Sequence, residues 1–446
     1  MKHLFCLMIL FAVFLSETNA QDFYTHPAWS KDATIYEVNV RQYSKEGNFK
    51  GVEAQLPRLK EMGVKILWLM PIYPIGVKER KGSLGSYYAV KDYRAVNPEY
   101  GTLADFKEFM KQAHALGFKV ILDWVANHSA PDNNLTVEHP DYYTHDSTGK
   151  IIPPVPDWTD VADFNYDNKG LWNYQIESMK FWIKEADVDG FRCDVAMMVP
   201  NEFWKEVRTQ LDKVKPVFML AEADGPEFHR NGFDMTYGWE LHSLMNQIAK
   251  GKKDTKDLVD YIHKNDSIYS HGEYRMYFTS NHDENSWNGS EYERMGDAAK
   301  VFAVLTFGLP GLPLIYSGQE SAEGRRIKFF DKDPIDWKDY PLAGFYKKLV
   351  WMKKENPALF NGLDGGNMTI IETGNKNIFC FTRTRGEDKV LFMLNLSGTE
   401  QKFNVNGAGI NGNYQSLFSD KPITLPAASA GKLAPWGYEV FVQNKR

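Results

Sequence analysis

Three carboxylic acid residues, Asp194, Glu222 and Asp283, stand at the ends of apolar segments that lie far apart in the sequence. Like charges brought together oppose folding, so such a set is costly unless the residues do chemistry. Cleavage of a glycosidic bond uses carboxylates in this way. One attacks the anomeric carbon, and another protonates the leaving oxygen and later activates water. The proton donor needs a raised pKa, which neighbouring carboxylates supply.

The segment 189–194 carries two opposite charges on one face of an expected strand. Arg192 and Asp194 are two residues apart, and because side chains alternate along a strand, both point the same way. Such charges are costly to bury unless they are paired or do chemistry. Taken alone, the segment fits a structural salt bridge beneath a loop as well as it fits a catalytic site. His128 and His282, which follow other apolar segments, favour the catalytic interpretation.

Eight short apolar segments alternate with helical patterns from residue 33 onward. One such helix is expected to begin after Thr102, a capping residue, and to close at Gly117. This alternation predicts an α/β fold, a (β/α)8 TIM barrel, with its active face at the carboxyl ends of the strands. The expected strands are 33–40, 64–71, 119–124, 189–196, 216–222, 232–237, 275–283 and 312–318.

Two further regions interrupt or follow this alternation. The stretch 129–168 is rich in Pro, Asp, Asn and Tyr and has no clear period, so we expect a short inserted subdomain after the third strand. Residues 361–446 show short alternating strands with Gly- and Asn-rich turns, which predicts a C-terminal β-sandwich domain. Residues 21–360 are then the catalytic barrel.

The first 20 residues have the pattern of a secretory signal peptide. Lys2 precedes the apolar run 4–15, and small and polar residues lead to Ala20, the expected cleavage position. We therefore expect an exported protein, and the sequence leaves open whether it is periplasmic or extracellular.

Composition narrows the range of partners. A net charge of −6 without basic runs is unlike a nucleic-acid-binding protein. No other apolar run approaches the length of a membrane span. Cys193 and Cys380 are the cysteines outside the signal. One lies in an expected barrel strand and the other in the C-terminal region, so they do not suggest a disulfide framework. The oligomeric state is left open.

Four motifs resemble those of the α-amylase family, glycoside hydrolase family 13, in its secreted bacterial-type members. They are 123–128, 190–194, Glu222 after the fifth strand, and 281–283. The resemblance implies that Asp194 is the nucleophile and Glu222 the general acid/base, and that Asp283 stabilises the transition state. It further implies that Tyr88 stacks on the sugar at the cleaved bond, that His128 and His282 hydrogen-bond this sugar, and that Arg192 positions the nucleophile and keeps it ionised.

The resemblance also raises two questions about ligands. Asn127 and Asp163 resemble a pair that shares a structural calcium ion, and an Asn–Asp hydrogen bond is the alternative. Met197 and Met198 stand where many relatives carry a Lys-His pair that touches the leaving-group sugars. No cofactor is expected for the chemistry itself. The short insertion suggests an open cleft, or one completed by another chain.

The resemblance implies a retaining α-glycoside hydrolase that cleaves α-1,4-glucosidic bonds in starch-derived oligo- or polysaccharides, with an α-glucan or maltooligosaccharide as substrate. A transglycosylase, or a glucosidase/isomerase of small α-glucosides, would share the same three carboxylates, because the difference lies in loop-built subsites. A non-catalytic sugar-binding homologue should have lost one of the three, and this chain keeps them all.

Overall fold

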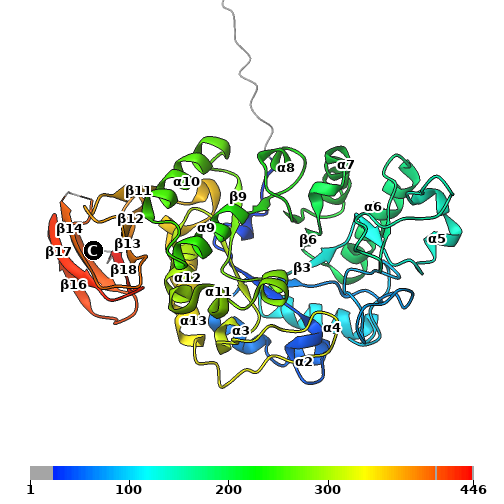
Figure 1. Ribbon diagram of the computed structural model, residues 1–446, viewed down its shortest axis with the longest axis horizontal. Helices are drawn as coiled ribbons and strands as arrows, with labels where there is room; N and C mark the ends of the chain where they lie inside the picture. Colours follow the sequence, from blue (N-terminus) through cyan, green and yellow to red (C-terminus); the bar gives the residue numbers. More distant parts are fainter. Residues whose placement is uncertain (1–23, 407–408, 444–446) are drawn as a thin grey trace, which may run out of the picture.

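The computed structural model describes residues 24–406 and 409–443. The expected signal peptide at 1–20 lies outside these described residues. Eight parallel strands close a barrel in the order β1-β10-β9-β8-β7-β6-β3-β2, with helices around it (Figure 1). This confirms the predicted fold class. The barrel strands are β1 (Ile35–Val38), β2 (Ile66–Leu69), β3 (Lys119–Trp124), β6 (Gly190–Cys193), β7 (Phe218–Ala221), β8 (Met235–Tyr237), β9 (Tyr274–Tyr277) and β10 (Leu312–Tyr316).

Capping residues in the sequence explain where the helices around the barrel begin and end. Thr102 caps helix α4 (Leu103–Ala115). It forms a capping box in which its side chain accepts a hydrogen bond from the N–H of Asp105. Gly63 ends α3 at a φ of 95°, a left-handed conformation that favours glycine. The longer helices are α3 (Leu56–Met62), α4 (Leu103–Ala115), α6 (Lys169–Ala186), α7 (Asn201–Asp212), α9 (Trp239–Ala249), α10 (Thr255–Ile268), α12 (Ala299–Gly308) and α13 (Ala343–Glu355).

The barrel interior is filled by side chains from alternate positions of its strands, and so it is a packed core. Ile66 and Trp68 of β2 meet Leu312 and Leu314 of β10 in this inner cluster, and all four are buried. The other faces of the strands pack against the helices in a larger apolar cluster. A rigid barrel is therefore available to position residues at its rim.

Most of the expected strands are shorter than their apolar segments, and the largest difference is at 275–283. The pattern predicted a strand at 275–283, but β9 ends at Tyr277 and the chain then turns. Asn281 explains the change, because its side-chain oxygen accepts from the N–H of Glu284 and its carbonyl accepts from the N–H of Asn285. The segment that carries Asp283 is therefore a helical turn at the strand's end and no part of the strand.

Two additions flank the barrel at opposite ends in Figure 1. Between β3 and α6, an insertion carries the paired strands β4 (His128–Ser129) and β5 (Ala162–Asp163) and the short helix α5 (Leu135–Glu138). After α13 comes an antiparallel C-terminal domain with a six-stranded sheet and the separate pair β14–β17. Its strands are β11 (Asn367–Ile371), β12 (Ile378–Arg385), β13 (Asp388–Asn395), β14 (Gln401–Asn406), β15 (Gly412–Ser416), β16 (Pro422–Leu425), β17 (Ala428–Leu433) and β18 (Tyr438–Gln443).

Two further sequence expectations can be compared with the structure. Cys193 and Cys380 are both buried and free, as expected from their separation. Among the described residues, no helix combines the length and the apolar character that crossing a bilayer requires.

Candidate active site

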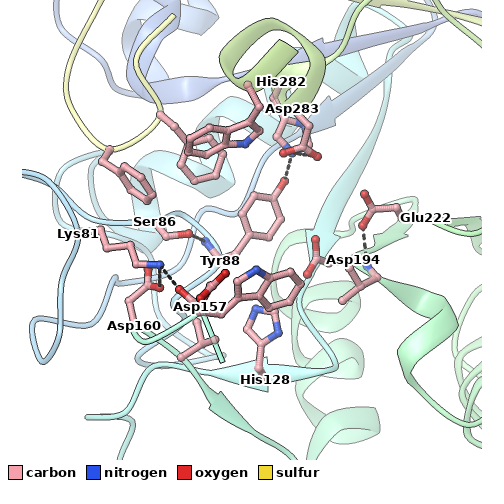
Figure 2. Close-up of a pocket in the computed structure, with 16 residues that line it drawn as sticks. Lys81, Ser86, Tyr88, His128, Asp157, Asp160, Asp194, Glu222, His282 and Asp283 are labelled. Carbon is pink, nitrogen blue, oxygen red and sulfur yellow. Dashed lines mark hydrogen bonds and ion pairs between the residues drawn. The ribbon is translucent and has the colours of Figure 1, made fainter. Parts of the chain in front are cut away.

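The predicted site residues meet at the carboxyl ends of the barrel strands. Asp194 directly follows β6, Glu222 directly follows β7, and Asp283 follows β9. They border a cavity of about 460 Å³ between the barrel rim and the surrounding loops (Figure 2). The predicted catalytic and substrate-binding residues that line this cavity are Tyr88, His128, Asp194, Glu222, His282 and Asp283.

A single guanidinium, that of Arg192, holds the carboxylates in place. Arg192 is fully buried, and its Nη1 lies 2.9 Å from Asp123 Oδ1 and 3.0 Å from Asp194 Oδ1. Its Nη2 lies 2.9 Å from Glu222 Oε2, and its Nε donates to the Tyr237 hydroxyl at 3.1 Å. Nη1 donates charge-assisted hydrogen bonds to Asp123 and Asp194, whereas the Nη2–Glu222 contact is an ion pair without hydrogen-bond geometry, so Arg192 holds both carboxylates beside one cation.

The backbone between β6 and the next turn is strained. Val195 has φ 36° and ψ 46°, a left-handed conformation that costs about 1–3 kcal/mol for a β-branched residue. Its N–H donates a 2.6 Å hydrogen bond to Glu222 Oε2. This hydrogen bond offsets the strain, because it links the segment of Asp194 to the Glu222 carboxylate.

The electrostatics of the cluster favour bound protons. Burial raises the pKa of Asp194 well above its ordinary value, the charge of Glu222 adds to the rise, and Arg192 opposes it. Burial also raises the pKa of Glu222, with Arg192 opposing and Asp283 adding. The Asp194–Glu222 pair therefore retains a proton above the usual carboxyl range, as a general acid requires. Arg192 lowers the pKa of Asp194, but burial and neighbouring carboxylates outweigh it.

His282 lies between two carboxylates. Its Nδ1 is 2.5 Å from Glu37 Oε1, and its Nε2 is 3.2 Å from Asp283 Oδ2. Burial alone disfavours the imidazolium, but the charges of Asp283 and Glu37 outweigh burial and hold the pKa of His282 well above its ordinary value. In return His282 offsets the burial of Asp283, whose pKa is lowered. His282 and Asp283 therefore form an ion pair at neutral pH.

Tyr88 and His128 form two of the cavity walls. The Tyr88 hydroxyl is 2.7 Å from His282 Nε2 and donates to Asp123 Oδ2 at 3.1 Å, which fixes the ring. Burial lowers the pKa of His128 to about 3, so its ring is neutral at pH 7 and keeps one donor nitrogen. A fixed ring and neutral donors suit a sugar, which offers apolar faces and hydroxyl groups.

Asn127 and Asp163 lie beside the cavity, where the insertion joins the barrel. The N–H of Phe164 donates to the Asn127 carbonyl at 3.1 Å, and Asp163 pairs with His128 across β4 and β5. Burial raises the pKa of Asp163, so a cation beside its carboxylate would be favourable. Within residues 24–406 and 409–443, no group of three or more His, Cys, Asp or Glu is arranged to hold a metal. A calcium ion here would need backbone carbonyls and water to complete its oxygen ligands.

Several residues at the site were missed by the sequence analysis. Glu37, buried in β1, contacts His282, and Tyr237 of β8 contacts Arg192. The signal for Glu37 was available, since a carboxylate within a fully apolar strand is costly unless paired. The other missed residues come from loops, where no periodicity identifies them. These cavity-lining loop residues include Lys81, Asp157, Trp158, Asp160, Trp287, Phe329 and Phe330.

Comparison with known proteins gives one family. The family model described as "Alpha amylase, catalytic domain" matches residues 15–150 and 156–358. Among curated proteins, alpha-amylase MalA of Haloarcula japonica is 29% identical over 433 residues, which cover 91% of this chain and 62% of MalA. The chain thus spans less than two thirds of that relative's length.

Solved structures agree in fold over nearly the whole chain. An alpha-amylase from Lactobacillus plantarum has a TM-score of 0.82 and 34% identity, covering 93% of this chain and 99% of the other. The maltogenic alpha-amylase AmyB from Thermotoga neapolitana has a TM-score of 0.84 and 31% identity, with the same coverage. The resemblance therefore extends beyond the barrel to the insertion and the C-terminal domain.

Proposed function

This chain belongs to the α-amylase family of glycoside hydrolases, and we propose that it hydrolyses α-1,4-glucosidic bonds in starch-derived oligo- or polysaccharides with retention of configuration. The predicted family and enzyme class are confirmed. Curated relatives named as amylases, such as the maltogenic alpha-amylase of Bacillus acidopullulyticus at 24% identity, support hydrolysis. Relatives named as maltosyltransferases also occur, but the transglycosylase alternative is less favoured.

In the first step we assign the nucleophile to Asp194. Its carboxylate attacks the anomeric carbon while the Glu222 carboxylic acid protonates the glycosidic oxygen, and the bond between that carbon and oxygen breaks. The leaving sugar departs with the proton. Arg192 supports this assignment because it contacts both carboxylates through different nitrogens.

In the second step Glu222, now ionised, takes a proton from water. The resulting hydroxide equivalent attacks the anomeric carbon, the ester to Asp194 breaks, and both carboxyl groups return to their starting states. The Val195 N–H, 2.6 Å from Glu222 Oε2, supports the carboxylate whenever it is ionised.

Asp283 is the proposed transition-state stabiliser, and Tyr88, His128 and His282 are the proposed sugar-binding residues. His282 lines the cavity, where its Nε2 lies 2.7 Å from the Tyr88 hydroxyl and 3.2 Å from Asp283 Oδ2 and so orients both side chains toward the sugar. Tyr88 is stacked on His282 with ring centroids 5.5 Å apart, which places an aromatic face at the cavity. A positively charged sugar ring developing next to Asp283 would be stabilised by its carboxylate.

The observation that carries this proposal is the grouping of Asp194, Glu222 and Asp283 around one cavity, with Arg192 beneath. The test is product analysis on maltose, maltoheptaose, cyclodextrin, pullulan, starch, trehalose and sucrose, with wild type beside Asp194→Asn. Cleavage of α-1,4 oligomers that vanishes in the variant is expected. Absence of turnover on every sugar, with binding intact in both proteins, would instead support the sugar-binding homologue.

Two further proposals concern export and calcium. The expected signal peptide at 1–20 supports export, and N-terminal sequencing of the mature protein should begin at Gln21. The meeting of Asn127 and Asp163 where the insertion joins the barrel supports a structural calcium ion held by these two residues, which would pin the insertion to the barrel and take no part in bond cleavage.

A further inference from the structure

An ion pair lines the cavity at the end away from Glu222. Lys81 Nζ lies 3.1 Å from Asp160 Oδ1 and donates to the Asp157 carbonyl at 2.9 Å. In Figure 2, Lys81, Asp157 and Asp160 lie on the opposite side of the cavity from Glu222, with Tyr88 and Asp194 between them. The Asp160 side chain is only 8% exposed, so its carboxylate is held at this position.

Three loops are joined at this end. Lys81 ties the loop after β2 to the insertion, and the same loop is tied to the segment after β10. There the Ser83 N–H and hydroxyl both donate to Asp331 Oδ1, at 2.9 and 2.6 Å, and the Leu84 N–H donates to the Phe330 carbonyl. A Cβ added at Gly82 would lie 2.4 Å from Phe330 Cβ, so the two loops touch. The loop after β2 is therefore joined both to the insertion and to the segment after β10.

Aromatic rings line the space between this end and the carboxylates. Trp158 of the insertion packs edge-on against His128, with centroids 5.6 Å apart. On the other wall Phe329 is parallel to Tyr88 at 6.2 Å, and Trp287 lies 5.1 Å from Phe329. Aromatic faces on two walls suit the apolar faces of glucosyl units.

The two ends of the cavity differ. If Glu222 protonates the leaving oxygen, as the proposed function requires, the leaving sugar lies beside Glu222 and the sugar that is retained extends toward Lys81. The retained sugar therefore points toward the Lys81–Asp160 ion pair, on the opposite side of the cavity from Glu222.

We propose that this enzyme acts on the non-reducing ends of α-glucan chains, because the Lys81–Asp160 ion pair closes the donor side of its cleft. A cavity of about 460 Å³ holds only a short donor segment before the chain meets Lys81. The ammonium group and the Asp157 and Asp160 oxygens would meet the terminal hydroxyls there. Chain interiors cannot thread past this point, so short maltooligosaccharides are released. This inference rests on the proposed function.

The test compares maltoheptaose that has a free non-reducing end with maltoheptaose whose terminal glucose carries a 4,6-O-acetal. Wild type should cleave the blocked sugar at least ~10-fold more slowly than the free one, a typical discrimination by a fitted pocket. Lys81→Ala should bring the two rates within ~3-fold and add longer products. Lys78→Ala is the matched control, since it removes the same charge from the same loop outside this cavity and should behave as wild type.

The outcomes separate this inference from the proposed function. Equal rates on blocked and free maltoheptaose for wild type, with cleavage abolished in Asp194→Asn, would overturn end-specific action and leave the hydrolase intact. Strong discrimination that Lys81→Ala leaves unchanged would overturn the role of the ion pair. If wild type cleaves neither sugar, the proposed function fails and this inference fails with it.

Discussion

The backbone N–H of Val195 donates to Glu222 Oε2 at 2.6 Å, and Val195 adopts a left-handed φ of 36° to do so. The hydrogen bond crosses from the turn after β6 to the residue after β7. It joins the segment of the proposed nucleophile to the proposed acid/base through a main-chain donor, whose position is set by the backbone of Val195. Local strain that is offset by such a contact is typical of functional sites.

Substitution of Val195 by glycine tests this strain. Glycine tolerates positive φ and keeps the N–H, so relief of strain should offset the lost side chain and leave the free energy of unfolding within about 1 kcal/mol of wild type. Val199→Gly, at a buried position with φ −116°, is the control and should cost on the order of 2 kcal/mol or more. Chemical denaturation measures both. Equal losses in the two variants would show that Val195 is not strained.

Removal of Arg192 should destabilise the fold in a pH-dependent manner. Arg192→Met leaves buried carboxylates without their cation, which typically costs about 3–5 kcal/mol. Without the guanidinium, the pKa values of Asp194 and Glu222 in the folded state rise further above their unfolded values. The folded variant therefore recovers stability as pH falls and these groups take up protons. Denaturation at pH 8 and pH 5 should show the smaller deficit at pH 5; an equal or larger deficit at pH 5 would contradict this account of the cluster.

The alkaline limb of activity should depend on Asp283. The Asp283 charge adds to the raised pKa of Glu222, so Asp283→Asn should lower the pKa of the general acid. Glu222 would then lose its proton at a lower pH, and the alkaline limb of kcat/KM for the residual activity should move to lower pH. The measurement is a pH profile on maltoheptaose for wild type and variant. A limb that stays in place or moves to higher pH would argue against Glu222 as the acid.

Glu37 should act on the site through His282. Glu37→Gln removes one of the two charges that hold the pKa of His282 above its ordinary value, so that pKa should fall while Asp283 still supports it. NMR titration of selectively labelled histidine measures the shift directly, and kcat should fall as the imidazolium is lost near neutral pH. Glu46→Gln, in the exposed bend after the short helix α1 (Val40–Tyr43), is the control and should leave the His282 titration unchanged. An unchanged titration in Glu37→Gln would contradict the positioning role.

Calcium removal should lower stability if Asn127 and Asp163 share an ion. Treatment with a chelator is expected to reduce the Tm, added calcium should restore it, and Asp163→Asn should abolish the difference, because an ion that binds only the folded state stabilises it. A Tm that is the same with and without chelator would argue against the ion and leave the Phe164 N–H, which donates to the Asn127 carbonyl, as the link between insertion and barrel.

Local patterns in the sequence were sufficient for the framework of the fold. Thr102 marks a helix start by short-range physics, and the strand Lys119–Trp124 occurs as its pattern predicts. The largest departure is the segment after Tyr277, where the side chain and carbonyl of Asn281 begin a helical turn that apolar patterning does not reveal.

Contacts between residues that lie far apart in the chain could not be predicted from the sequence. Glu37 meets His282 across the closure of the barrel, and only the strand order shows that β1 lies beside β10. Lys81 and Asp160 come from two loops without periodicity, so nothing in either segment predicts their ion pair. Asp194 and Glu222 could be identified because each directly follows a strand, whereas the walls of the cavity depend on how loops fold over the rim.

The most direct test of the central claim is to trap the covalent intermediate. The variant Glu222→Gln, treated with α-maltosyl fluoride, can form the glycosyl-enzyme because fluoride leaves without acid assistance, but lacks the base that activates water. Mass spectrometry of the digested protein should then find a maltosyl group on the peptide that contains Asp194, and none in Asp194→Asn/Glu222→Gln. A maltosyl group on the peptide of Asp283, or consumption of the fluoride without any labelled peptide, would contradict the assignment of Asp194 as the nucleophile.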